Sequence, residues 1–331
     1  MAAGIASLKM KKSLRVVICI VSSLLLLRHS ASAQEAPDTV TVGIYITSIH
    51  DIDFKQKEYT VNLWLWLKYR NRNFNFSENL EVPQAKTVTK SFITADSSGE
   101  FVKMQMKLQC VMKDNWRIAS FPFDTQKLRL SIENSQFDSR TLVFVPDTSG
   151  DHFDKRFTLR GWDIDSCIIS TGIKAYETSF GDESLTKPHS EYSSFRVRLS
   201  LTRAAGGLFW KLFLGMYIAF LIAYVCFYIH ADGMDSRFGL SVGSLFAVIG
   251  NKYIIDSSLP ESTSFTLVDT LHGLTLFCIF TVITATAYSL KLVKQNKIKQ
   301  ANRFDRTASH VVLAFYVILN LVFIIQASRG Q

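Results

Sequence analysis

Residues 238–253 read Phe-Gly-Leu-Ser-Val-Gly-Ser-Leu-Phe-Ala-Val-Ile-Gly-Asn-Lys-Tyr, and no other part of the chain is as informative about the architecture. It is apolar enough to enter a lipid bilayer. It also carries serines, glycines, Asn251 and Lys252, which lipid does not favour. A membrane helix of this composition needs protein or water on at least one side.

Three other apolar stretches accompany this one in the last third of the chain. We predict spans at residues 208–229, 238 to about 258, 265–292 and 308–325. Each reaches roughly the 20 residues that a bilayer requires. We therefore expect residues 204–331 to form an all-α, four-helix transmembrane domain, with a short basic loop at 293–307.

The N-terminus has the pattern of a targeting segment. An apolar run at 16–27, too short for an ordinary span, is followed by the small residues Ala31-Ser32-Ala33. We predict a signal peptide at 1–33; an uncleaved anchor is the alternative. Losing its five basic residues lowers the formal net charge from +9 to +4, so the charge gives no support for nucleic-acid binding. Those residues are Lys9, Lys11, Lys12, Arg15 and Arg28.

Residues 34–203 form the next predicted domain, and from about Thr39 to Arg203 the dominant period is two, typical of strands with one apolar face. The apolar positions are Val40, Val42, Ile44 and Ile46; Val61, Leu63, Leu65 and Leu67; Val102, Met104, Met106, Leu108 and Cys110; Leu128, Leu130 and Ile132; and Phe195, Val197, Leu199 and Leu201. The pattern predicts an all-β, antiparallel sandwich. One disulfide between Cys110 and Cys167 is left open by the sequence.

Export and charge predict the same orientation. A signal peptide places the sandwich outside the membrane, so the loop between the third and fourth spans lies inside. That region holds Lys291, Lys294, Lys297, Lys299, Arg303 and Arg306. The positive-inside rule agrees, and we expect a multi-pass protein of the cell (inner) membrane with an extracytoplasmic N-terminal domain.

Short sequence words occur in a specific order along this framework. They are Ile49-His50-Asp51-Ile52-Asp53, Phe121-Pro122-Phe123-Asp124, Arg203 at the end of the last strand, Arg237-Phe238-Gly239-Leu240, and Leu259-Pro260. With a sandwich and four spans, this order resembles the pentameric ligand-gated ion channels, the Cys-loop receptor superfamily, over nearly the whole mature chain. Asp114 and Leu128 stand where the family's disulfide cysteines would be, and Gly215 replaces a proline of the first span. The resemblance is therefore to a prokaryotic-type member.

The resemblance implies a homopentameric receptor channel, similar to neurotransmitter-gated channels, that is opened by a small molecule or by protons. It would conduct monovalent ions passively, without a cofactor or metal. The alternative is a non-conducting, membrane-anchored extracytoplasmic binding or sensor protein of the same fold. An enzyme is not expected, because the sequence has no Gly-rich phosphate loop, no His-Glu-x-x-His and no Gly-x-Ser-x-Gly.

The family register implies that one face of the second span lines the pore. Its residues are Gly239, Gly243, Phe246, Gly250, Ile254 and Ser257, whose spacing is helical. Five copies of Phe246 would form an apolar constriction that gates by dewetting. In the alternative, Gly239 and Gly243 form a helix-packing seam. That arrangement would instead turn the side chains of Ser241, Ser244 and Asn251 toward water.

Charges near the two mouths are the candidates for ion selectivity. Asp235 and Arg237 flank the inner mouth and Asp256 is near the outer mouth. Rings of acidic residues favour cations, so we expect cation selectivity. Anion selectivity is the alternative, because the Arg-Phe-Gly-Leu opening at 237–240 looks more like the anion-selective animal members, although the proline that precedes their Arg by two is missing here. We expect Lys252 to lie off the pore axis, snorkelling to the interface or pairing with an acidic neighbour.

The family's agonist site lies between subunits, and several aromatic residues match it. The ligand-binding candidates are Trp64, Phe137, Tyr176, Phe180 and Tyr192. Ser135 stands where a central aromatic is expected, so a cation–π cage is incomplete. Ordinary packing is the alternative for Trp64.

Family geometry also implies a coupling cluster where the sandwich meets the membrane. Asp53, Asp124 and Arg203 would meet there, an arginine between two carboxylates. Three separate solvated charges are the alternative.

Overall fold

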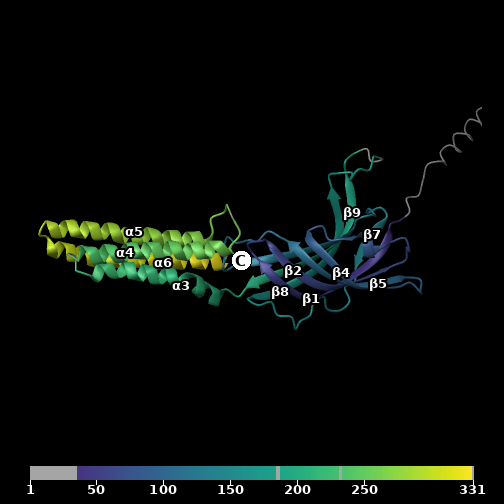
Figure 1. Ribbon diagram of the computed structural model, residues 1–331, viewed down its shortest axis with the longest axis horizontal. Coiled ribbons are helices and arrows are strands. Elements are labelled where there is room, and N and C mark those ends of the chain that lie inside the picture. Colours follow the sequence, from purple (N-terminus) through teal and green to yellow (C-terminus); the bar gives the residue numbers. More distant parts are fainter. Residues whose placement is uncertain (1–35, 184–186, 231–232, 262, 330–331) are drawn as a thin grey trace, which may run out of the picture. The chain divides into compact units, whose positions relative to one another are not determined.

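The structure, a computed structural model, describes residues 36–183, 187–230, 233–261 and 263–329. A nine-stranded, two-sheet β-sandwich is followed by four long helices (Figure 1), which confirms the predicted fold class. The predicted signal peptide, 1–33, lies outside the described residues.

The two sheets differ in size and in strand direction. The strands are β1 (Asp38–Asp53), β2 (Glu58–Tyr69), β3 (Leu80–Glu81), β4 (Ala85–Asp96), β5 (Val102–Lys113), β6 (Thr125–Asn134), β7 (Leu142–Pro146), β8 (Trp162–Tyr176) and β9 (Ser190–Arg203). One sheet has the order β4-β5-β2-β1-β7 and the other β3-β6-β9-β8. The pairings are antiparallel except for β1 with β7, which is parallel.

The predicted period of two places the apolar side chains of each strand on one face, and the two sheets pack against each other through these apolar faces. On β1 the side chains of Val40, Val42 and Ile44 are fully buried, while the residues between them are partly exposed or small. The methionines Met104 and Met106 on β5 belong to the same core, as expected. Gly43 faces the Trp66 ring so closely that a Cβ would overlap it, at 2.3 Å from the indole.

The second part of the chain consists of helices long and apolar enough to cross a membrane. They are α3 (Ala205–Val225), continued by the 3-10 helix η1 (Cys226–Tyr228), α4 (Met234–Ser258), α5 (Leu267–Lys294) and α6 (Ile298–Arg329). A one-turn helix, α2 (Phe76–Asn79), lies within the sandwich region. Figure 1 shows the four long helices side by side, as expected for a multi-pass membrane protein.

The basic segment at 293–307 is mostly helical, so its prediction as a loop was wrong. α5 ends at Lys294, α6 begins at Ile298, and Asn296 makes the turn with a φ of 60°. The Gln, Lys, Ala and Arg residues that follow are good helix formers, and they extend the helix by several turns beyond the apolar span. The basic charges therefore lie on the ends of two helices.

Loops that follow the strands contact the ends of the helices. The Leu267 N–H, in the first turn of α5, donates to the Ala119 carbonyl at 2.9 Å. The Phe123 ring lies 5.6 Å from that of Phe209 on α3. Thr266 and Asp269 form a capping box at the start of α5.

The described cysteines are all free thiols: Cys110, Cys167, Cys226 and Cys278. The disulfide left open by the sequence is therefore not formed. Burial raises the pKa of the Cys110 thiol to about 12.

Candidate functional site

One face of α4 is not covered by any other part of the described chain. The six residues predicted to line a pore, Gly239, Gly243, Phe246, Gly250, Ile254 and Ser257, are all exposed. Phe246 and Ile254 are 66% and 68% exposed. A Cβ placed on any of the three glycines would meet nothing within 4 Å. This apolar, glycine-rich face is open to solvent, lipid or another chain.

The polar residues on the other side of α4 lie inside the bundle. Ser241 and Ser244 are buried, and their hydroxyls donate to the carbonyls one turn earlier, at 2.8 and 2.7 Å. The Asn251 amide donates to the Leu212 carbonyl of α3 at 3.2 Å. These are the three residues that the packing-seam alternative turns toward water, and in the single chain they contact its own helices instead.

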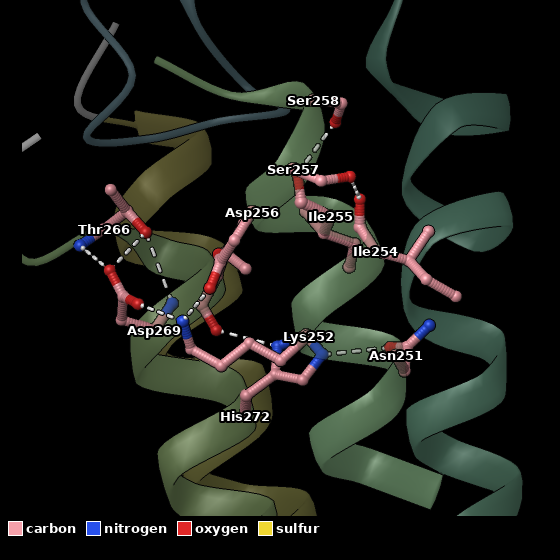
Figure 2. A network of polar contacts seen from close by, with 11 residues as sticks. Asn251, Lys252, Ile254, Ile255, Asp256, Ser257, Ser258, Thr266, Asp269 and His272 are labelled. Carbon is pink, nitrogen blue, oxygen red and sulfur yellow. Dashed lines mark hydrogen bonds and ion pairs between the residues drawn. The ribbon is translucent and has the colours of Figure 1, made fainter. Parts of the chain in front are cut away.

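Asn251 also connects α4 to α5 (Figure 2). Both ring nitrogens of the buried His272 face oxygen acceptors, the Val268 carbonyl at 2.8 Å and the Asn251 amide oxygen at 2.9 Å. Gly215 on α3 leaves room for the Asn251 side chain, because a Cβ there would lie 3.3 Å from the amide nitrogen, a tight contact. One asparagine therefore joins three of the four long helices.

Lys252 lies between two carboxylates near the same end of the bundle (Figure 2). Its Nζ is 2.5 Å from Asp256 and 2.8 Å from Asp269. The expectation that Lys252 pairs with an acidic neighbour is confirmed. Asp256, a selectivity candidate, is half exposed, and its carboxylate is already paired with Lys252.

Arg237, the second selectivity candidate, is buried, so its expected place at an open mouth was wrong. Its guanidinium is 2.8 Å from the Asp305 carboxylate of α6, and its Nε donates to the Ile229 carbonyl at 3.1 Å. The Ser289 hydroxyl donates to the same Asp305 oxygen at 3.0 Å. Asp235, in the first turn of α4, remains exposed.

Three of the predicted ligand-binding aromatics form one cluster at the β8–β9 end of the sandwich. The rings of Tyr176, Phe180 and Tyr192 lie 5.5 to 6.0 Å apart in edge-to-face contacts. The Tyr176 hydroxyl donates to the buried Glu133 carboxylate at 2.8 Å. Burial and this hydrogen bond raise the pKa of Tyr176.

A cavity of about 520 Å³ lies beside this cluster. Tyr192 and Phe137 line it, together with Arg140 and three carboxylate side chains, those of Asp138, Asp182 and Glu191. The Arg140 guanidinium lies 2.7 Å from the Asp138 carboxylate. Phe137 itself packs against Phe74, with ring centroids 4.9 Å apart. The cavity combines aromatic edges with acidic and basic groups, and the carboxylates outnumber the arginine, which suits a small polar ligand with a cationic group.

His189 forms one side of this cavity. Its ring nitrogens lie 3.1 Å from the Glu191 carboxylate and 3.6 Å from that of Glu177. The hydrogen bond with Glu191, followed by the Glu177 charge, raises the pKa of His189.

Trp64 does not join the other aromatics within one chain. It lies on β2, where its ring is 6.1 Å from the exposed Phe92. The structure thus brings four of the five ligand-binding candidates to one end of β8 and β9 and leaves Trp64 on the other sheet.

The predicted coupling cluster is a pair, not a triad. The Arg203 guanidinium donates to both oxygens of Asp124, at 2.6 and 3.1 Å, and Gln126 donates to the same carboxylate at 2.6 Å. The Asp53 carboxylate instead accepts from the Gln56 N–H at 2.7 Å, and among the described residues it forms no ion pair with Arg203. Asp53 stands at a tight turn, where capping the backbone is the nearer hydrogen bond.

Three aromatic rings that the sequence reasoning missed enclose Arg203. Its guanidinium lies 4.0 Å from the Trp162 ring centroid, 4.7 Å from Phe54 and 5.0 Å from Phe121. Asp305 was also missed. An acidic residue isolated in a basic helix next to a span was the signal, because such a charge requires a partner.

Searches against protein-family models and against curated proteins found no match. No group of His, Cys, Asp and Glu side chains in the described ranges is arranged to hold a metal ion.

Proposed function

We propose that this chain is the subunit of a homopentameric ion channel that conducts small ions passively and is opened by a small molecule or by protons. The proposal rests on the resemblance of its sequence to the pentameric ligand-gated ion channels and on one observation in particular. That observation is the uncovered, glycine-rich face of α4.

The polar residues of α4 form hydrogen bonds inside the bundle, on the side away from the exposed glycines. They therefore give no reason for the exposed face to carry three glycines. A face with three glycines gives lipid chains little side-chain surface to contact. In a closed ring of five copies this face would instead surround a water-filled path. Phe246, with Gly243 and Gly250 one turn away on either side, would form the narrowest ring and gate by dewetting.

The charges that remain available favour cations. Arg237 is neutralised by Asp305 inside the chain, while Asp235 is exposed in the first turn of α4. Five copies of Asp235 would form an acidic ring at that mouth. The predicted orientation makes it the cytoplasmic mouth of a channel in the inner membrane.

The sensing site would be the aromatic and acidic cavity at the β8–β9 end of the extracytoplasmic sandwich. Its carboxylates and the edges of Tyr192 and Phe137 suit a small cation. Trp64 of a neighbouring subunit would complete the site, which explains why it is separate within one chain.

Current through a planar bilayer from the purified full-length protein tests the proposal. The expected result is a particle of about five chains in mild detergent, with a current whose reversal potential follows the cation gradient. A stable monomer, or a pentamer without current at any pH tested, would contradict it. The second outcome would favour the non-conducting binding protein.

Two substitutions on α4 test which face lines the path. Phe246→Ser should give a leak or easier opening, because water persists in a less apolar ring. Asn251→Ala, on the other face, is the matched control and should change the single-channel conductance less. Cysteine modification at position 251 with protection at 246 would reverse the assignment.

A further inference from the structure

A cavity of about 540 Å³ lies where the end of β1 meets the first turns of α3 and the end of α4. Ser258 and Leu259 line it on the α4 side, and Figure 2 shows Ser258 at that helix end. Arg203, the last residue of β9, also lines it, so it lies at the opposite end of β9 from the aromatic cavity beside Tyr192. The channel proposal assigns no ligand to it.

Apolar side chains form most of the wall. Leu208 and Leu212 lie one turn apart on α3 and are partly exposed, and Leu259 is 9% exposed. The Phe54 ring is held by Trp116, with stacked ring centroids 4.8 Å apart. The wall is therefore formed within the single chain, and it presents an apolar surface to a ligand.

Three charged side chains line the cavity: Asp51, Asp53 and Arg203. The Arg203 charge is matched by Asp124, which does not line the cavity, through contacts of 2.6 and 3.1 Å. The Asp53 carboxylate accepts the Gln56 N–H at 2.7 Å and forms no ion pair in the described ranges. Its negative charge is therefore available to a ligand.

Asp51 adds a second negative charge at the rim. Its carboxylate lies 2.7 Å from Nδ1 of His50, and a hydrogen bond from a neutral imidazole leaves that charge in place. Both aspartates are exposed, and the lysines that follow in the same turn, Lys55 and Lys57, do not line the cavity. The cavity thus has a negative rim beside an apolar wall.

Two aromatic rings of the lining already contact a cation. The Arg203 guanidinium lies 4.7 Å from the centroid of Phe54 and 5.0 Å from that of Phe121. A cationic group of a ligand is therefore directed to the carboxylates, while its apolar part contacts α3. A molecule with one cationic end and one apolar body matches this division.

The position of the cavity along α3 fits such a molecule as well. Trp210, which lies between the two leucines in the sequence, is 60% exposed in the first turns of the helix. An exposed tryptophan near the end of an apolar helix is typical of the boundary between membrane and water. Amphipathic molecules collect at that boundary, with the apolar part in lipid and the charge in water.

We propose that this cavity binds a small amphipathic amine. The ammonium group contacts Asp51 and Asp53, and the alkyl or aryl body lies against Leu208, Leu212 and Leu259. The inference rests on the lining of the cavity alone, and it holds whether or not the protein conducts.

Photoaffinity labelling of the full-length protein in a neutral detergent tests the site. The probe is hexylamine that carries a diazirine on its alkyl chain, and labelled peptides are identified by mass spectrometry. We expect labels within residues 51–54, 208–212 or 258–259. Excess hexylamine should prevent this labelling. Equal concentrations of hexan-1-ol, which lacks the charge, or of ethylamine, which lacks the long apolar chain, should prevent it much less.

Asp51→Asn/Asp53→Asn removes the negative rim and keeps its shape. Asparagine tolerates the left-handed φ of 53° at position 51, and its amide oxygen at position 53 can still accept the Gln56 N–H. Labelling of the cavity should fall roughly fivefold, as expected for losing two exposed charge contacts. The melting temperature of the variant checks that the fold survives.

Asp163→Asn is the matched control. It removes the same charge from an exposed position at the same end of the sandwich, where Asp163 is the strand partner of Thr202 and does not line the cavity. Labelling of the cavity should stay within about twofold of the wild type, because only general attraction is lost.

Four results would overturn the proposal. Equal losses in the test and control variants would indicate general electrostatic attraction. Equal protection by hexan-1-ol and hexylamine would assign the cavity to neutral apolar molecules. Labelling confined to the aromatic cavity beside Tyr192 would place the amine at the proposed sensing site instead. No labelling of the lining would indicate that another copy of the chain covers it.

Discussion

Arg203 and Arg237 each form a buried ion pair with an aspartate, but the two pairs differ in how completely their hydrogen bonds are made. Arg203 binds Asp124 through two nitrogens, and Gln126 and three aromatic rings complete the surroundings. Arg237 binds Asp305 with a single contact, and each partner keeps one buried atom without a hydrogen bond.

The difference separates two uses of a buried charge. A pair whose hydrogen bonds are all made fixes the geometry of the segments that carry it, here the loop before β6 and the end of β9. A pair with unpaired atoms leaves part of its hydrogen-bonding capacity unused. Burial alone would not have distinguished them, because both arginines are at most one-tenth exposed.

The largest expected effect is that of Arg203→Ala. It leaves the Asp124 carboxylate, 2% exposed, without its cation, and removing one partner of a buried pair costs about 3–5 kcal/mol. The thermal unfolding of the purified protein measures this. Arg203→Lys keeps the charge but not the forked guanidinium. Its melting temperature should therefore lie between those of the wild type and of Arg203→Ala. Under the proposed function, Arg203→Ala should also abolish opening while ligand binding persists.

An unchanged melting temperature for Arg203→Ala would remove the distinction between the two pairs. It would mean that the aromatic rings and Gln126 hold the loop without the arginine.

Asp305→Asn should be destabilising by roughly 3 kcal/mol, because it leaves the Arg237 charge buried and unpaired. The double variant Arg237→Met/Asp305→Leu should recover most of that loss. Apolar residues of similar volume often replace a buried pair without a net cost, and this pair already leaves two atoms unsatisfied. Thermal unfolding of single and double variants gives the comparison. A double variant as unstable as the single one would show that the unpaired atoms carry no penalty.

An ion pair at the protein surface provides a comparison with a much smaller expected loss of stability. Arg156→Ala breaks the bond to Asp154, but the arginine side chain is 89% exposed. Water and salt screen such an exposed pair, so the melting temperature should hardly change. A loss as large as that of Arg203→Ala would mean that exposure does not rank these pairs.

The smallest effect concerns pH and the exposed pair of His189 with Glu191. The hydrogen bond raises the pKa of His189, so the protonated form is favoured in the folded state. Its stabilising contribution is complete below the unfolded pKa, about 6.5, and is lost as the pH rises through the higher folded pKa. Glu191→Gln should lower the His189 pKa toward its ordinary value, measured by NMR of labelled histidines. An identical pKa in the variant would exclude Glu191 as the main cause.

Much of the architecture could be predicted from local patterns in the sequence. The period of two along residues 39–203 places alternate side chains on one face of each strand, so it determines which residues form the sandwich core. The length and apolarity of four segments identify the helices that can cross a membrane. The start of α6 at Ile298 was missed, because charged helix formers extend the helix ahead of its apolar span.

Contacts between distant segments were decided only by the tertiary structure. The family resemblance placed Asp53 with Arg203, yet a nearer backbone N–H binds its carboxylate. It placed Arg237 at a mouth, yet Asp305, far along the chain, draws the guanidinium into the bundle. A charge takes the partner that burial brings within hydrogen-bond distance, and no local pattern encodes that distance. The sequence therefore determined which faces are apolar, and only the folded chain decided which charges meet.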